Sequence, residues 1–137
     1  MTSASTKAGP LKGIKVVDLT SVLMGPYTTQ ILADMGAEVI KVEAPQGDTT
    51  RHLPPGIEGK RGAMFMNVNR GKKSITVDLK QQAGRDVVLK LIEDADIFIH
   101  SMRAQAIRRL GLDYAAVNAA NADIIYANLY GFSREGP

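Results

Sequence analysis

The sequence predicts an α/β fold in which helices cover both faces of a parallel sheet. Two observations indicate this class: strand-like segments alternate with helix-like segments five times along the chain, and the first strand–helix–strand unit spans about 30 residues, the length of a parallel crossover. The length of 137 residues suits one domain with a hydrophobic core. We expect residues 1–10, which are small and polar, to form a flexible leader and residues 11–137 to form the domain.

The first strand–helix–strand unit occupies residues 14–43. Residues 14–20 are a β-branched apolar run of strand length. A helix is expected to follow Gly25-Pro26, because proline is favoured in a first helical turn and apolar residues recur at helical spacing from Tyr27 to Met35. Gly36 can take the positive φ that often ends a helix, and residues 37–43 alternate like a second strand. The expected geometry is a right-handed parallel crossover.

The remaining elements are weaker signals in the same alternating order. Residues 44–62 contain three prolines and four glycines, and we interpret them as an irregular segment of the kind that often carries function. Asp113 can cap a short helix that reaches residue 118. Further strands are expected at residues 74–79, 96–100 and 123–129, and further helices at residues 83–95 and 104–110.

Composition and charge exclude several classes of protein. A net charge of +3 and an aromatic content of 5% with no tryptophan argue against nucleic acid as a partner. The absence of cysteine excludes a disulfide scaffold and a thiolate site, and two isolated histidines make a metal cluster improbable. No apolar run approaches the roughly 18 residues of a membrane span, and no secretory signal is visible. We expect a cytoplasmic protein without a membrane partner.

A ligand is expected at the carboxyl ends of the parallel strands, but the familiar nucleotide motifs are missing. Glu43 stands where a ribose-binding acid would be, yet the turn after the first strand has one glycine instead of G-x-G-x-x-G, and Pro26 lacks an N–H for phosphate. No phosphate-binding P-loop or hydrolase triad is present, and His100 is interpreted as a packed histidine rather than a base. Cations after the third and fourth strands favour a phosphorylated ligand or are solvated surface charges, and the sequence leaves both interpretations open: Lys80, Arg103, Arg108 and Arg109.

A series of motifs extends over nearly the whole chain after the leader. They include PLKGIKVVDLT at residues 10–20, LADMGAEVIKVEAP at residues 32–45, NRGKKSITVDLK at residues 69–80, and the Gly-Phe and Gly-Pro pairs near the end. In order and spacing these motifs closely resemble the start of the family III coenzyme A (CoA) transferases. That family includes formyl-CoA and carnitine CoA transferases and the related 2-methylacyl-CoA racemases.

The resemblance implies that this chain is an N-terminal, Rossmann-like CoA-binding domain, which agrees with the missing nicotinamide motif. Leu23 and Met24 would lie on the pantetheine side, and Lys80 and Arg109 would contact phosphates. Ala44 stands at an adenine-side position that is commonly Arg, and Leu23 at one that is Gln in formyl-CoA transferases, which argues against a formyl or oxalyl substrate. The implied CoA-binding residues are Leu23, Met24, Ala44, Val77, Asp78, Leu79, Lys80, Ser101, Met102, Arg103 and Arg109.

The activity implied for the parent protein is transfer of CoA from an acyl-CoA to a carboxylic acid acceptor through an aspartyl covalent intermediate, with no metal. The family's nucleophilic aspartate lies beyond the position of Pro137. We therefore expect this chain to hold no catalytic residue, to be a truncated part of a longer enzyme, and to be inactive alone. The alternatives are a fragment of a 2-methylacyl-CoA racemase and a stand-alone CoA- or nucleotide-binding module.

The resemblance also implies an intertwined homodimer. A single copy of the chain should then expose apolar side chains that the rest of the assembly covers. We expect exposure at Leu23, Met24, Met64, Met66 and Phe132, whereas Phe65 is equally compatible with the domain's own core.

Overall fold

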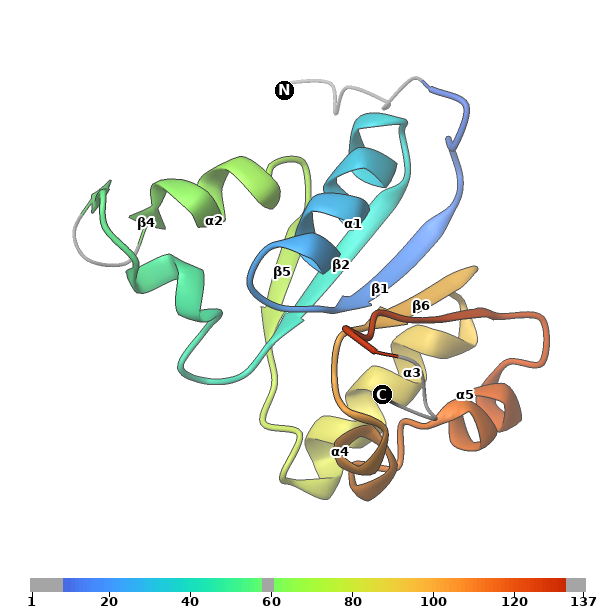
Figure 1. Ribbon diagram of the computed structural model, residues 1–137. Helices are drawn as coiled ribbons and strands as arrows, with labels where there is room; N and C mark the ends of the chain where they lie inside the picture. Colours follow the sequence, from blue (N-terminus) through green and yellow to red (C-terminus); the bar gives the residue numbers. More distant parts are fainter. Residues whose placement is uncertain (1–8, 58–60, 133–137) are drawn as a thin grey trace, which may run out of the picture.

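The computed structural model describes residues 9–57 and 61–132, so most of the expected leader lies outside the described residues. At its centre is a sheet of five parallel strands in the order β5-β2-β1-β6-β7 (Figure 1). This order confirms the predicted parallel sheet and makes it Rossmann-like. The strands are β1 (Lys15–Leu19), β2 (Glu38–Glu43), β5 (Lys73–Thr76), β6 (Ile97–His100) and β7 (Ile125–Asn128).

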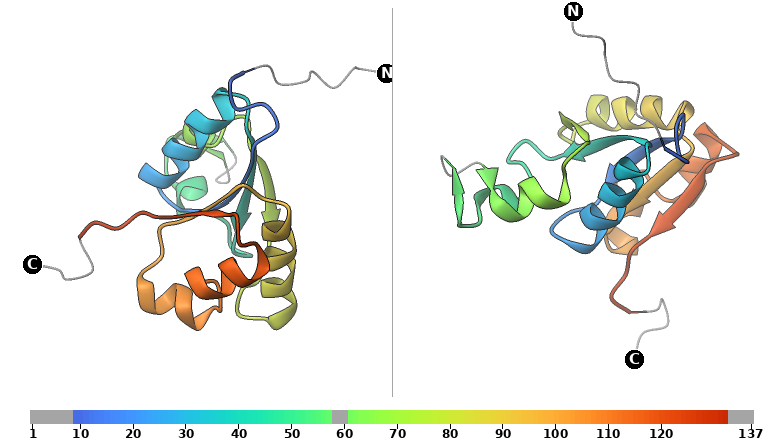
Figure 2. Two further views of the ribbon diagram at one scale, coloured as in Figure 1. Left: turned by 90° about the vertical axis from the view of Figure 1, so that its right-hand side faces the viewer. Right: turned by 90° about the horizontal axis from the view of Figure 1, so that it is seen from above.

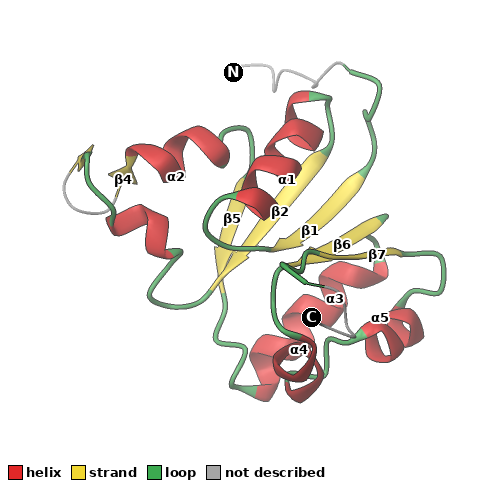
Figure 3. Ribbon diagram, viewed as in Figure 1, coloured by secondary structure: helices red, strands yellow, loops and turns green. Residues whose placement is uncertain are grey.

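Helices cover both faces of the sheet, as predicted (Figures 2 and 3). The chain moves from β1 to β2 to β5 on one side, then returns past β1 to β6 and β7 on the other. Right-handed crossovers therefore place the first two helices on one face and the last three on the opposite face. The first pair is α1 (Met24–Asp34) and α2 (Ala63–Val68), and the second set is α3 (Gln82–Glu93), α4 (Ala104–Arg109) and α5 (Tyr114–Ala120).

The two faces of the sheet have hydrophobic cores of unequal size. Strand alternation sends Val17 to the face of α3, α4 and α5, where it joins Phe98 and Ile92 in the larger cluster. Its neighbour Val16 points to the face of α1 and joins a smaller cluster with Val39. The larger cluster stabilises the fold by burial of apolar area, whereas the α1 face has room for polar groups near the carboxyl ends of the strands.

Helix α1 is oriented opposite to the usual amphipathic arrangement. Its buried residues are small or polar, namely Gly25, Pro26, Thr29, Gln30 and Ala33. Three of the four apolar residues that gave the helical pattern point outward, with exposed fractions of 50% at Tyr27, 41% at Ile31 and 40% at Met35, whereas the fourth, Leu32, packs against the smaller core. The pattern predicted the helix correctly but did not show which of its faces contacts the sheet.

The irregular segment predicted at residues 44–62 belongs to a lobe of residues 44–72 beside β5, and its described residues form only short regular elements (Figure 1). The lobe contains a 3-10 helix η1 (Thr49–His52), the antiparallel strands β3 (Gly56–Ile57) and β4 (Arg61–Gly62), and α2. Phe65 is 7% exposed and lies beneath the Arg51 guanidinium, whose central carbon is 3.7 Å from the ring centre. Each of these elements is six residues long or shorter, which is too short to give a periodic signal in the sequence.

The third predicted strand is shorter than expected. Strand β5 ends at Thr76 instead of residue 79, although the Val77 N–H still donates to the Glu43 carbonyl at 2.8 Å. Beyond it, Asp78 Oδ1 accepts a hydrogen bond from the Lys80 N–H at 3.0 Å. This local side-chain bond favours a turn and directs the chain toward α3.

Candidate functional site

The carboxyl ends of the five strands lie along one edge of the sheet. The strand order reverses between β1, which continues to β2, and β6, which continues to β7. In open parallel sheets ligands bind at such a switch point. The segments that meet there are the β1–α1 loop and the residues that follow His100.

The β1–α1 loop is held against the end of β6. The Ser21 N–H donates to Ser101 Oγ at 3.2 Å, which joins residues 80 positions apart. Val22 has a φ of +70°, and it is the one non-glycine residue with positive φ in the described part of the chain. Leu23 and Met24 follow with exposed fractions of 41% and 71%. The structure thus brings the predicted residues Leu23, Met24 and Ser101 to one edge.

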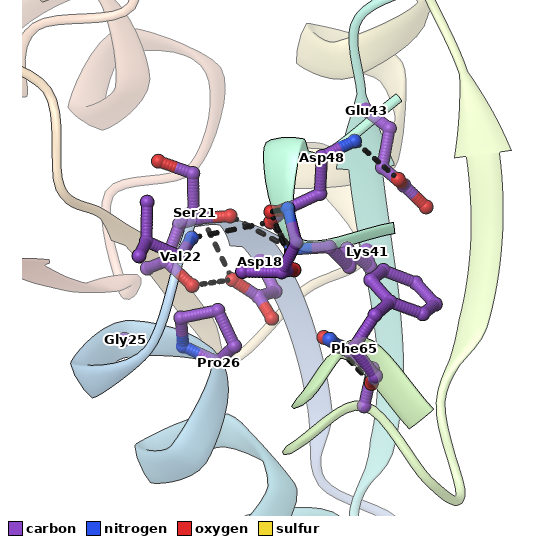
Figure 4. A network of polar contacts seen from close by, with 12 residues as sticks. Asp18, Ser21, Val22, Gly25, Pro26, Lys41, Glu43, Asp48 and Phe65 are labelled. Atoms are coloured by element: carbon purple, nitrogen blue, oxygen red, sulfur yellow. Dashed lines mark hydrogen bonds and ion pairs between the residues drawn. The ribbon is translucent and has the colours of Figure 1, made fainter. Parts of the chain in front are cut away.

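Beneath this loop, charged side chains are buried on the α1 face of the sheet (Figure 4). Asp18 is fully buried and accepts hydrogen bonds from the Thr20 main chain at 2.9 Å, the Thr29 hydroxyl at 2.6 Å and Lys72 Nζ at 3.1 Å. Burial lowers the pKa of Lys72, although the charge of Asp18 opposes that change. Each carboxylate oxygen of Asp18 is therefore satisfied inside the fold.

A second buried pair connects β2 to the lobe. Lys41 Nζ lies 3.0 Å from Asp48 Oδ2 and donates to the Thr20 carbonyl at 2.9 Å, and both side chains are at most 2% exposed. Asp48 also accepts from the Val22 N–H at 3.2 Å. Burial by itself raises the pKa of Asp48. Hydrogen bonds from Thr50 and the charge of Lys41 have the opposite and larger combined effect, so the pKa of Asp48 lies below its usual value.

Glu43, at the end of β2, is fully engaged with protein groups. Arg51 donates to both of its oxygens, at 2.7 and 2.6 Å, and the Ser74 hydroxyl donates at 2.5 Å. Burial opposes its ionisation, yet these bonds and the Asp48 N–H lower the pKa of Glu43 to about 2. A carboxylate bound in this way is not free to bind a ribose, which agrees with the missing dinucleotide motif.

A cavity of about 510 Å³ lies on the other face, between β7, α4 and α5. Among the predicted CoA-binding residues, Arg103 lines it within the described part of the chain, and so does Arg108, one of the candidate phosphate-binding cations. Asn128 also lines it, and its buried Oδ1 accepts no hydrogen bond from the described residues. The full lining consists of Arg103, Ala104, Ile107, Arg108, Asp113, Tyr114, Tyr126, Asn128, Tyr130, Gly131 and Phe132.

Sequence reasoning missed the aromatic lining of this cavity. Tyr126 and Asn128 are two residues apart, so the alternation of a strand places them on one face of β7, and Tyr130 follows two residues beyond the end of that strand. This two-residue spacing was the signal in the sequence that could have indicated a shared polar and aromatic face. It did not show that α4 and α5 would leave an open volume over this face.

His100 has a structural role, in agreement with its interpretation from the sequence. It is fully buried, and its Nδ1 accepts from the Met102 N–H at 3.2 Å while Nε2 lies 2.9 Å from the Tyr126 hydroxyl. That hydroxyl donates to the Leu112 carbonyl at 3.1 Å. Burial lowers the pKa of His100, so the ring is neutral at pH 7 and donates from Nε2.

The other predicted CoA-binding residues are spread along the carboxyl edge. Val77 is buried in the larger core, and Leu79 and Met102 pack against it while partly exposed. Lys80 and Arg109 are exposed, and across residues 9–57 and 61–132 their charged groups form no hydrogen bond or ion pair. Ala44 is exposed after β2, and Asp78 is partly exposed after β5. Their contact with CoA stays a prediction.

Two further features concern metals and membranes. Within residues 9–57 and 61–132, no three His, Asp or Glu side chains are grouped so that they could hold a metal ion. Of the helices that the structure describes, none has both the length and the apolar composition that a membrane crossing requires.

The sequence of this chain is similar to a known protein family and to several curated proteins. Residues 11–137 match the model of CoA-transferase family III. An acyl-CoA transferase from Fusarium pseudograminearum is 47% identical over 98% of this chain and 32% of its own length. A succinate–glutarate CoA-transferase from Agrobacterium fabrum is 41% identical over 100% of this chain and 36% of its own length. The chain thus spans about a third of the length of these curated relatives.

Solved structures give the same picture. A CAIB/BAIF family protein from Brucella suis superimposes with a TM-score of 0.89 at 43% identity, over 94% of this chain and 35% of that protein. A protein from Mycobacterium tuberculosis gives 0.87 at 38% identity, over 96% and 36%. A short chain dehydrogenase/reductase family protein, with a TM-score of 0.51 and 15% identity, shares the fold alone.

Proposed function

Because this chain belongs to CoA-transferase family III, whose model matches residues 11–137, we propose that it is the N-terminal CoA-binding part of an acyl-CoA:carboxylate CoA transferase. The observation that carries the proposal is the family match over the whole described domain, together with a ligand edge that lacks dinucleotide chemistry. Glu43 is occupied by Arg51 and Ser74, whereas exposed cations remain at Lys80 and Arg109. Both curated relatives described above are called transferases, which favours transfer over racemisation.

In the proposed reaction an aspartate outside this chain attacks the thioester carbonyl of acyl-CoA. The carbon–sulfur bond breaks, CoA leaves as the thiolate, and a mixed anhydride forms. The thiolate then attacks the aspartyl carbonyl, which releases the donor acid and leaves CoA on the enzyme as a thioester. Attack by the acceptor carboxylate and a second thiolate transfer complete the exchange and restore the aspartate.

The role of the present residues is to bind and orient the coenzyme. Lys80 and Arg109 would contact the diphosphate and 3′-phosphate, since charge-assisted bonds to phosphate are short and strong. The loop that carries Leu23 and Met24 would contact the pantetheine arm. Without the nucleophile this chain orients CoA but supplies no covalent route, so we propose that it has no turnover alone.

Calorimetric titration with CoA tests the phosphate assignment. We expect the Lys80→Ala/Arg109→Ala variant to bind CoA at least tenfold more weakly than wild type, because two charge-assisted bonds are lost. We also expect wild-type binding to weaken as salt rises. The Lys12→Ala/Lys15→Ala variant removes equal charge at the opposite edge of the sheet and should bind like wild type. Equal affinity in wild type and the Lys80/Arg109 variant would remove the assignment.

The assembly and the location of the protein are further parts of the proposal. We propose a homodimer in the complete protein, which the exposed apolar residues of α1 support. The cytoplasmic location stays a prediction from the sequence.

A further inference from the structure

The conformation of Val22 requires an explanation within the fold. A β-branched residue at a φ of +70° is strained, and such a residue keeps this conformation only where the surrounding structure holds it there. Val22 is 47% exposed, so packing of its own side chain cannot be what holds it. The restraint must act on the main chain of the loop.

Three side chains bind the main chain of this loop from other elements, and Figure 4 shows two of them, Lys41 and Asp48. Asp48 Oδ2 accepts from the Val22 N–H at 3.2 Å, and Lys41 Nζ donates to the Thr20 carbonyl at 2.9 Å. Ser101 Oγ accepts from the Ser21 N–H at 3.2 Å. Each of the residues 20, 21 and 22 thus has one main-chain group fixed by a residue at least 21 positions away.

Asp48 and Lys41 are themselves rigidly placed. The two side chains lie 3.0 Å apart and are nearly fully buried. The other oxygen of Asp48 accepts from the Thr50 N–H at 3.0 Å and hydroxyl at 2.7 Å, while its own N–H donates to Glu43 at 2.9 Å. The Lys41–Asp48 pair therefore fixes the β1–α1 loop in place relative to β2 and the lobe.

We propose that Lys41 and Asp48 are positioning residues that hold residues 20–23 in the strained conformation from which Leu23 and Met24 face the acyl-CoA. The inference rests on the proposed function for its ligand. Its geometric part, that the pair maintains the conformation of Val22, stands on the contacts above. Neither Lys41 nor Asp48 touches the coenzyme in this proposal; both act through the loop.

The test measures CoA affinity in the complete polypeptide in which residues 1–137 occur. We expect Asp48→Ala to weaken CoA binding about tenfold, because the loop loses its preorganisation. Adding Val22→Gly should recover about threefold or more of that loss, since glycine adopts positive φ without strain. In the wild-type background, Val22→Gly should give no such gain.

A second pair of variants covers the case in which Asp48→Ala leaves Lys41 buried without a partner and the protein does not fold. Lys41→Met/Asp48→Ala removes both charges together, and it is compared with and without Val22→Gly. The matched control is Lys73→Met/Glu38→Gln, which removes an exposed pair at the far edge of the sheet and should bind CoA like wild type.

The outcomes separate the two proposals. Folded variants that bind CoA as wild type does, or a loss that Val22→Gly fails to recover, would overturn the positioning role. If wild type itself does not bind CoA, the proposed function fails, and hydrogen exchange at the Val22 amide decides the geometric part. Slow exchange in wild type that becomes fast in Lys41→Met/Asp48→Ala would support it, and equal rates would refute it.

Discussion

At the scale of single residues, Glu43 links the stability of the domain to pH. Its pKa falls from 4.5 to about 2 in the folded chain, so folding favours its ionised form. This contribution is complete above pH 4.5, on the order of 3 kcal/mol, and is lost as the pH falls toward 2. Because Glu43 is 4% exposed, solvent screens its interactions only weakly.

We expect Glu43→Gln to lower the free energy of unfolding by about 2–3 kcal/mol at pH 7, and the difference from wild type to shrink as the pH falls from 6 to 3. Urea denaturation across this range measures both. Glu38→Gln, which alters an exposed pair with Lys73, should change stability by less than about 0.5 kcal/mol throughout. A difference between Glu43→Gln and wild type that stays constant from pH 6 to pH 3 would contradict the assignment.

Gly25 shows a different constraint, that of close approach. A Cβ at this position would overlap the side chain of Thr20, which is 3% exposed and whose hydroxyl donates to Asp18 at 2.5 Å. Thr20 therefore cannot rotate away without breaking a buried bond. We expect Gly25→Ala to destabilise the chain by about 1–3 kcal/mol in thermal unfolding. Gly131→Ala, where a Cβ would meet open space, should change stability by less than about 0.5 kcal/mol. Equal stabilities for the two variants would contradict this prediction, because they would show that the β1–α1 loop moves to accommodate the added methyl group.

At the scale of elements, α3 and α5 are joined by one side chain that follows α5. Asn121 Nδ2 donates to the Ile92 carbonyl at 3.0 Å and the Ala95 carbonyl at 2.7 Å, which satisfies carbonyls near the end of α3. Its Oδ1 accepts from the Asp123 N–H at 3.1 Å. The start of α5 is capped by Asp113, as predicted, through a bond of 3.2 Å from the Ala116 N–H.

We expect Asn121→Ala to cost about 1–3 kcal/mol in urea denaturation, because carbonyls beneath α5 lose their donor. Hydrogen exchange should become faster at the end of α3 in particular. Asn118→Ala is the matched control, since Asn118 lies within α5 and its side chain makes no hydrogen bond with the described residues. If both variants are equally stable, Asn121 does not join the two helices.

At the scale of the whole molecule, the outward side chains of α1 lie on a helix that neighbours α2, where Met64 and Met66 are also exposed (Figure 1). Exposure at Leu23, Met24, Met64, Met66 and Phe132 agrees with expectation, whereas Phe65 belongs to the core. An apolar surface of this kind is typical of an interface. The proposed homodimer would cover it with a second copy.

We expect the 137-residue chain to self-associate at micromolar concentrations and to bind a hydrophobic dye. Ile31→Gln/Met35→Gln should reduce both, since glutamine keeps helix propensity while it removes the apolar contact. Light scattering measures the first effect. Val87→Gln, a similar change on an exposed residue of α3, should leave association unchanged. A monodisperse wild-type monomer without dye binding would defeat the prediction.

The sequence by itself determined the alternation of strands and helices, the parallel sheet and the edge at which a ligand is expected. These follow from local signals: β-branched runs such as residues 14–20, the helix start at Gly25-Pro26 and the cap at Asp113. Each depends on a few neighbouring residues, so it can be recognised without knowledge of the rest. The family motifs extended this to CoA, but the contacts of residues such as Lys80 stay predictions.

Only the tertiary structure decided which faces meet. Lys72 pairs with Asp18, which lies 54 positions away in the sequence. The buried charge of Lys41 is stable because the lobe places Asp48 beside it, 3.0 Å away. The outward face of α1 and the cavity over Tyr126 likewise depend on how separate elements pack. A buried charge is stable only beside its partner, and the distance between partners is set by the fold of the whole chain rather than by their spacing in the sequence.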